Sequence, residues 1–117
     1  MANPKVLIIV AGDPRASGRP AEAIRIAAGV GTWKKTDFTV YLRGRAVLAV
    51  SEFADEFVDE DNYTRYLPIA AESGRPIYVQ KDAPEIRELG ESIFPFQEIS
   101  DEELAELAAA STYLISF

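Results

Sequence analysis

The segment Lys5-Val6-Leu7-Ile8-Ile9-Val10-Ala11 decides the fold that this sequence predicts. Its apolar run, rich in Val and Ile, is typical of a central strand that is covered on both faces of a sheet. A polar loop follows at residues 12–19, and Pro20 suits the first turn of a helix. That helix is expected from about residue 21 to residue 29 or 30, and its many alanines allow it to pack closely on the sheet.

Strands and helices alternate along the rest of the chain. Further strands are predicted at Asp37–Arg43, Pro76–Gln80, Phe96–Ile99 and Thr112–Phe117. Further helices are predicted within Asn62–Glu72, from Asp82 to about Gly90, and from Asp101 to Ala110. Residues 46–50 either extend the second strand past a turn or begin a short helix, and residues 51–62 are expected to form a loop with partial helix.

Local signals indicate where the later helices begin. Ser100-Asp101-Glu102-Glu103 has the sequence of a capping box, in which the Ser and Glu side chains satisfy the first free N–H groups of a helix. Asp82 is expected to cap another helix in the same way, with Glu85 reaching back to it. Pro68 fits poorly inside a helix, so it either marks a late start near Leu67 or kinks the helix.

This order of elements predicts one α/β domain over residues 1–117, because strands joined by helical crossovers build a parallel sheet. The expected architecture is a three-layer α/β/α sandwich around a mainly parallel five-stranded sheet. A chain of 117 residues has the right length for a single hydrophobic core.

Charge and composition exclude several kinds of partner. The formal net charge is −7, and the two small basic clusters, Lys34-Lys35 and Arg43 with Arg45, are too few for the footprint of a nucleic-acid binder. The apolar first strand is much too short to span a bilayer, so we expect no membrane partner. Since the chain has no cysteine and can form no disulfide, we expect a cytoplasmic location.

The missing residue types limit the chemistry. Without His or Cys, the chain can form neither a Ser-His or Cys-His nucleophile pair nor a zinc site of the usual Cys/His type. A general acid or base would have to be Asp, Glu, Lys or Tyr. The loop at residues 12–19 has neither the P-loop spacing nor the Gly-x-Gly-x-x-Gly spacing of dinucleotide sites. We therefore expect no cofactor, no metal site and no catalytic residues.

Acidic residues cluster just before the second predicted helix. They are Asp55, Glu56, Asp59, Glu60 and Asp61. Their oxygen atoms could bind a hard cation, but the cluster lacks the spacing and the turn glycine of an EF-hand. A solvated acidic face explains the cluster better.

Several segments along nearly the whole chain carry a resemblance to a known family. They are the apolar first strand with its polar loop and Ala-rich helix, Val40-Tyr41-Leu42-Arg43-Gly44-Arg45-Ala46-Val47, Ser73-Gly74-Arg75-Pro76-Ile77-Tyr78-Val79, and the end from Glu103-Leu104 to Tyr113-Leu114-Ile115-Ser116-Phe117. In these segments the sequence resembles the DsrE/DsrF/DsrH-like family, which has the YchN-like fold and includes the subunits of a bacterial sulfur relay. The resemblance implies a homo-oligomer (dimer, trimer or hexamer) or a hetero-oligomer with other family members.

The same resemblance singles out one position. In the active sulfur carriers of that family, the cysteine that bears the persulfide lies just after the strand that corresponds to Ile77-Tyr78-Val79. In this sequence Gln80 stands there, followed by Lys81. A glutamine amide cannot carry a persulfide, so the resemblance implies a family member without the sulfur-carrying residue.

The carboxyl ends of the predicted strands give the candidate site, because ligands of open α/β sheets bind at that edge. Three loops would meet there, at residues 12–19, 43–45 and 80–82. The candidate ligand-binding residues that they supply are Asp13, Arg15, Arg43, Gln80 and Lys81. Cationic side chains beside helix starts suit an anion, so we expect a small anionic or polar ligand.

Two functional hypotheses follow. The first is a non-catalytic DsrE-like protein that forms a homo-oligomer and either binds a small anionic ligand or acts as an accessory subunit of a sulfur-relay-type complex. The alternative is a small enzyme that uses Lys81, Asp13 and Tyr78 in a pocket at the strand ends.

Overall fold

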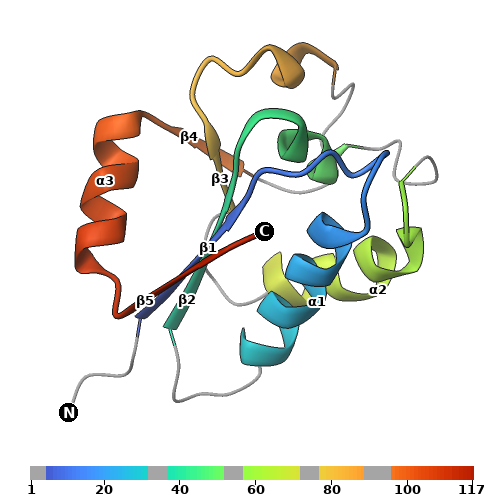
Figure 1. Ribbon diagram of the computed structural model, residues 1–117, viewed down its shortest axis with the longest axis horizontal. Coiled ribbons are helices and arrows are strands. Elements are labelled where there is room, and N and C mark those ends of the chain that lie inside the picture. Colours follow the sequence, from blue (N-terminus) through green and yellow to red (C-terminus); the bar gives the residue numbers. More distant parts are fainter. Residues whose placement is uncertain (1–4, 32–36, 52–56, 72–76, 89–95) are drawn as a thin grey trace.

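The computed structural model describes residues 5–31, 37–51, 57–71, 77–88 and 96–117 (Figure 1). The strands are β1 (Lys5–Val10), β2 (Asp37–Leu42), β3 (Ile77–Gln80), β4 (Phe96–Ile99) and β5 (Tyr113–Ser116). The α-helices are α1 (Arg19–Gly31), α2 (Glu60–Ala71) and α3 (Asp101–Ala110), and the 3₁₀ helices are η1 (Gly44–Val50) and η3 (Pro84–Glu88). Within these ranges, no helix is long and apolar enough to cross a membrane.

The strands form one five-stranded sheet in the order β4-β3-β2-β1-β5, and all of its described pairs are parallel. Helices α1 and α2 lie on one face of the sheet, and α3 lies on the other (Figure 1). The predicted three-layer α/β/α sandwich with a parallel sheet is therefore confirmed. The apolar β1 lies between β2 and β5, and its Leu7 is fully buried, as the opening segment predicted.

The main core lies between the sheet and the layer of α1 and α2. Alternate residues of β1, namely Val6, Ile8 and Val10, point into it, since successive side chains of a strand face opposite ways. Ala-rich α1 packs close to the sheet with Ala23 and Ala27 fully buried. At the far side of this core the rings of Phe57 and Tyr63 meet edge to face, with centroids 5.0 Å apart.

The opposite layer is thinner. Its buried residues are Leu7, Tyr41 and Ile99. Helix α3 covers them with Leu104, Leu107 and Ala108, which are themselves only partly buried, and no residue of α3 is fully buried. The sheet is thus well covered on one face and lightly covered on the other.

Some local predictions hold and others are wrong. The capping box at the start of α3 is confirmed: the Glu103 N–H donates to Ser100 Oγ, and the Ser100 N–H donates to Glu103 Oε1. The capping of a helix by Asp82 is wrong. The backbone of Asp82 is left-handed, with φ 61°, its N–H donates to Glu98 Oε1, and the helix that follows is the short 3₁₀ helix η3.

Two other segments were open in the sequence. Residues 46–50 belong to η1, so the short helix is the correct alternative and the extension of the second strand is wrong, and every one of these residues is buried. Helix α2 begins at Glu60, so the proposed late start near Leu67 is wrong. The early start fits a turn of helix that is anchored on α1, because Asn62 Nδ2 donates to the Ala21 carbonyl and Tyr63 is buried.

Candidate functional site

Gln80 is the best-defined member of the candidate site. It ends β3, and its side-chain Oε1 accepts a hydrogen bond from the Gly44 N–H at 3.0 Å. Gly44 follows the neighbouring strand β2 and has a positive φ of 57°, a conformation that favours glycine. Gln80 therefore ties the ends of β2 and β3 together, and its amide oxygen has a structural use.

Replacing Gln80 by Ala is expected to lower the free energy of unfolding by about 1 kcal/mol, because the Gly44 N–H loses its acceptor. The Gln80→Glu variant keeps an acceptor oxygen and should retain most of the stability. Gln97→Ala removes an exposed glutamine from β4 and serves as the matched control. Urea unfolding followed by circular dichroism measures the difference; equal effects at positions 80 and 97 would contradict this role of Gln80.

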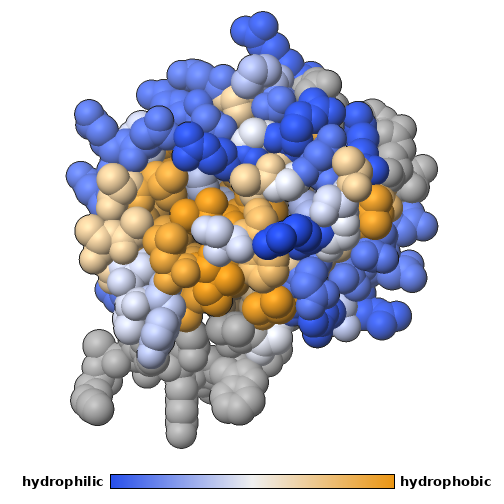
Figure 2. Space-filling view, in the orientation of Figure 1, coloured by the Kyte–Doolittle hydropathy of each residue, from blue (hydrophilic) through white to orange (hydrophobic). Residues whose placement is uncertain are grey.

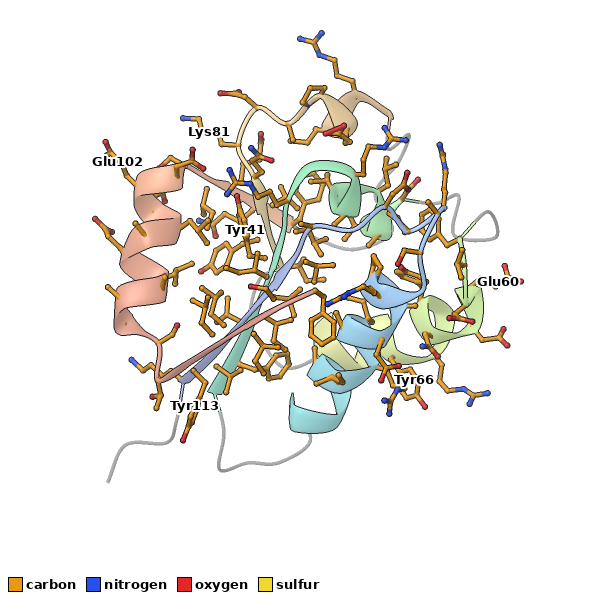
Figure 3. All side chains as sticks on the ribbon, viewed as in Figure 1. Tyr41, Glu60, Tyr66, Lys81, Glu102 and Tyr113 are labelled. Carbon is orange, nitrogen blue, oxygen red and sulfur yellow. The ribbon has the colours of Figure 1, made fainter. Side chains whose placement is uncertain are left out.

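Arg43 and Lys81 flank this hydrogen bond as exposed cations. The backbone of Arg43 is fixed by its N–H, which donates to the Val10 carbonyl, and that of Lys81 by a bond to the Ile99 carbonyl. Lys81 lies at the same end of the sheet as Glu102 in the first turn of α3 (Figure 3). Arg43, Gly44, Gln80 and Lys81 together form what we call the strand-end surface.

Tyr41 lies in the sheet just below the strand-end surface and points toward α3 (Figure 3). It is fully buried, and its hydroxyl has no hydrogen-bond partner within the part of the chain that the structure describes. Burial raises the pKa of Tyr41; the charge of Arg43 opposes this effect, and that of Asp101 adds to it. The charges of Arg43 and Asp101 thus act in opposite directions on the pKa of Tyr41.

Asp13 and Arg15 lie in a turn in which three successive N–H groups, those of residues 15–17, are used within the turn. The Arg15 N–H donates to Asp13 Oδ1 at 2.9 Å, and the N–H groups of Ala16 and Ser17 donate to the Asp13 carbonyl. The turn is held to the rest of the protein by the Val58 N–H, which donates to the Pro14 carbonyl at 2.8 Å. These three N–H groups are therefore not free to bind a phosphate.

Arg45 is not among the site residues that the sequence predicts, yet it connects two parts of this end of the molecule. Its guanidinium lies 3.7 Å from Asp13 Oδ2 and 3.7 Å from Glu85 Oε2. It therefore links the turn after β1 to η3, and Asp13 faces a structural ion pair. The positive φ of Gly44 turns the chain between Arg43 and Arg45, but neither ion-pair partner is adjacent to Arg45 in the sequence.

None of the three cavities described here is lined by a residue of the strand-end surface. A cavity of about 260 Å³ between α3 and the edge of the sheet is lined by Tyr78, Gln97, Ile99, Glu103, Glu106, Leu107 and Ala110. A second, of about 330 Å³, lies beside η3, and a third, of about 590 Å³, lies beside Asp59 and the start of α2. Among the described residues, no three His, Cys, Asp or Glu side chains are arranged to hold a metal ion.

The residues of the alternative enzyme hypothesis are not gathered in one place. Tyr78 packs on the α3 side of the sheet. Asp13 pairs with Arg45 and influences Tyr63, which belongs to the core on the opposite side. Lys81 lies on the exposed strand-end surface. The structure brings Arg43, Gln80 and Lys81 together, and it separates Asp13 from Tyr78.

Comparison with known proteins identifies the fold. No family model matches the sequence, and no curated protein matches it. Among solved structures, the YchN protein from E. coli is similar over 97% of this chain and 99% of its own, with a TM-score of 0.79 and 19% sequence identity. The chain therefore has the YchN fold, which is the DsrE/DsrF-like fold that the sequence resemblance predicted.

Proposed function

We propose that the chain is a non-catalytic DsrE-like protein that forms a homo-oligomer and uses its strand-end surface for binding. The observation that carries the proposal is the role of Gln80, whose amide oxygen holds the Gly44 N–H at the position where the resemblance implies a sulfur-carrying cysteine. A side chain used in this way contributes to the shape of the surface. A cytoplasmic location fits the proposal, because the chain has no cysteine to form a disulfide.

The charge at the strand ends favours a small anion as ligand. Arg43 and Lys81 are exposed cations beside Gly44 and Gln80, in a protein whose net charge is −7. An anion between the two cations would add two attractive interactions, which offset the repulsion between Arg43 and Lys81. Docking on a cysteine-bearing relative, as an accessory subunit of a sulfur-relay-type complex, would use the same surface with a carboxylate of the relative in place of the anion.

Titration with inorganic phosphate, followed through backbone amide NMR shifts, tests the binding proposal. The amides of Gly44 and Lys81 are expected to shift with saturation in the wild type, and Lys81→Ala and Arg43→Ala should each weaken the binding at least several-fold. Lys5→Ala is the matched control, since Lys5 is an exposed lysine at the opposite end of the sheet. The anion proposal fails if Lys81→Ala and Lys5→Ala bind phosphate equally well.

A further inference from the structure

The edge strand β5 leaves a large part of its apolar surface uncovered. The exposed fractions are 60% for Tyr113, 51% for Leu114 and 38% for Ile115, and all four residues of the strand are exposed. Figure 2 shows apolar side chains gathered over this strand, between α3 and α1. Such a patch on an edge strand normally marks an interaction site, because the strand also offers unpaired backbone groups.

The other edge of the sheet is different. Strand β4 exposes Gln97 and Glu98, a polar and a charged side chain, which are typical of an edge that is protected against pairing. Strand β5, Tyr113-Leu114-Ile115-Ser116, carries no charge. In a protein of net charge −7, two copies repel each other least where an uncharged segment lies at the contact.

The sheet face beside β5 is also open. Ile9 of β1, the strand next to β5, is only partly buried, although β1 lies inside the sheet. Leu114 lies opposite Leu7 in the register, so it points to the same lightly covered face as α3. The uncovered area therefore continues from β5 toward the partly buried Leu104 and Leu107 of α3.

An exposed strand that is apolar and uncharged fits best against another strand of the same kind, and the β5 strand of a second copy is such a strand. We propose that β5 of one copy pairs antiparallel with β5 of another across a two-fold axis, which would join two five-stranded sheets into one. Pairing of β5 with the edge β4, which carries Glu98, would instead be head to tail, and would build a ring or an open filament rather than a two-fold dimer. This inference rests on the homo-oligomer of the proposed function and names its surface.

The area of such a contact sets a further requirement. A stable interface buries roughly 800 Å² on each partner, which is more than a strand of four residues can supply. The flanking side of α3 must therefore take part. The exposed residues of α3 include Ala105 and Ala109, whose small side chains would allow two helices to approach closely.

A single introduced cysteine tests the pairing directly, because the natural chain has none. The variants Leu114→Cys and Ile115→Cys place a thiol near the centre of β5, where a two-fold axis brings each residue close to its own copy. Val58→Cys is the matched control, since Val58 and Ile115 are both 38% exposed. Under mild oxidation we expect a disulfide-linked dimer to form at least tenfold faster for a β5 variant than for the control; equal rates would overturn the proposal.

A charge substitution gives a second, independent test. Ile115→Lys should lower the molar mass in solution by splitting the β5 contact, whereas Val58→Lys should leave the mass unchanged. Circular dichroism checks that both variants are folded. If Ile115→Lys is unfolded, the cross-linking rates of the cysteine variants test the β5 contact instead. An oligomeric wild type whose mass Ile115→Lys does not change contradicts the β5 contact alone; a monomeric wild type contradicts the proposed oligomer as well. Growth into filaments with concentration would indicate head-to-tail pairing and would also overturn the inference.

Discussion

Replacing Leu7 by Ala is expected to lower the free energy of unfolding by about 2–5 kcal/mol, the usual cost of a cavity at a fully buried leucine. Leu7 lies in the central part of the sheet and is packed against α3 together with Tyr41 and Ile99. A void there cannot be filled easily, because the strands on both sides fix the backbone of β1. Urea unfolding at low protein concentration measures the loss.

Leu114→Ala is the matched control, because Leu114 lies directly opposite Leu7 in the parallel register and is 51% exposed. We expect it to cost less than about 1 kcal/mol in the monomer, since most of the removed surface was already in contact with water. Equal losses at the two positions would mean that β5 is buried in the folded monomer, which would contradict the described edge.

Tyr63 is expected to make the protein sensitive to alkaline pH. Its side chain is buried, its hydroxyl has no hydrogen-bond partner among the described residues, and burial, with smaller contributions from Asp59 and Asp13, raises its pKa. The unfolded chain releases this proton near pH 10, whereas the folded chain retains it. The stability that depends on the neutral hydroxyl is therefore complete below about pH 10 and falls above it, by up to about 1.4 kcal/mol per pH unit.

The variant Tyr63→Phe tests this directly. Near pH 7 it should be at least as stable as the wild type, because removing an unpaired buried hydroxyl removes its desolvation cost, on the order of 1 kcal/mol. Between pH 10 and pH 12 it should lose less stability per pH unit than the wild type. Tyr113→Phe, which removes an exposed hydroxyl, is the control. If Tyr63→Phe shows the same alkaline loss as the wild type, another group causes it.

The sequence predicted those parts of the fold that depend on local patterns. The apolar β1 and the capping box at Ser100 are recognisable because the residues that interact are neighbours in the chain. The predicted cap at Asp82 is wrong because contacts between residues far apart in the sequence determine the local structure. The Asp82 N–H donates to Glu98, and the carboxylate of Glu85 pairs with Arg45 instead of reaching back to Asp82. The short apolar segment at residues 46–50 could not be assigned, since its periodicity fits a strand, a helix or the observed 3₁₀ helix equally.

The candidate site was predictable only in part for the same reason. The edge of the sheet follows from the order of parallel strands, and it correctly places Arg43 and Gln80 near each other. The bond between Gln80 and Gly44 joins residues 36 positions apart, and the role of Arg45 depends on two partners from different loops. No local pattern contains such contacts. The exposure of β5 could not be predicted either, because Tyr113-Leu114-Ile115 has the apolar composition of an ordinary buried strand.

The molar mass of the wild-type protein in solution tests the central claim, a homo-oligomer on the YchN fold, most directly. Sedimentation equilibrium between about 1 and 100 µM is expected to give a multiple of the chain mass of 12.9 kDa. A dimer or hexamer agrees with the two-fold contact at β5. A trimer would contradict that contact but would still support the homo-oligomer. A mass of 12.9 kDa over the whole concentration range would contradict the account.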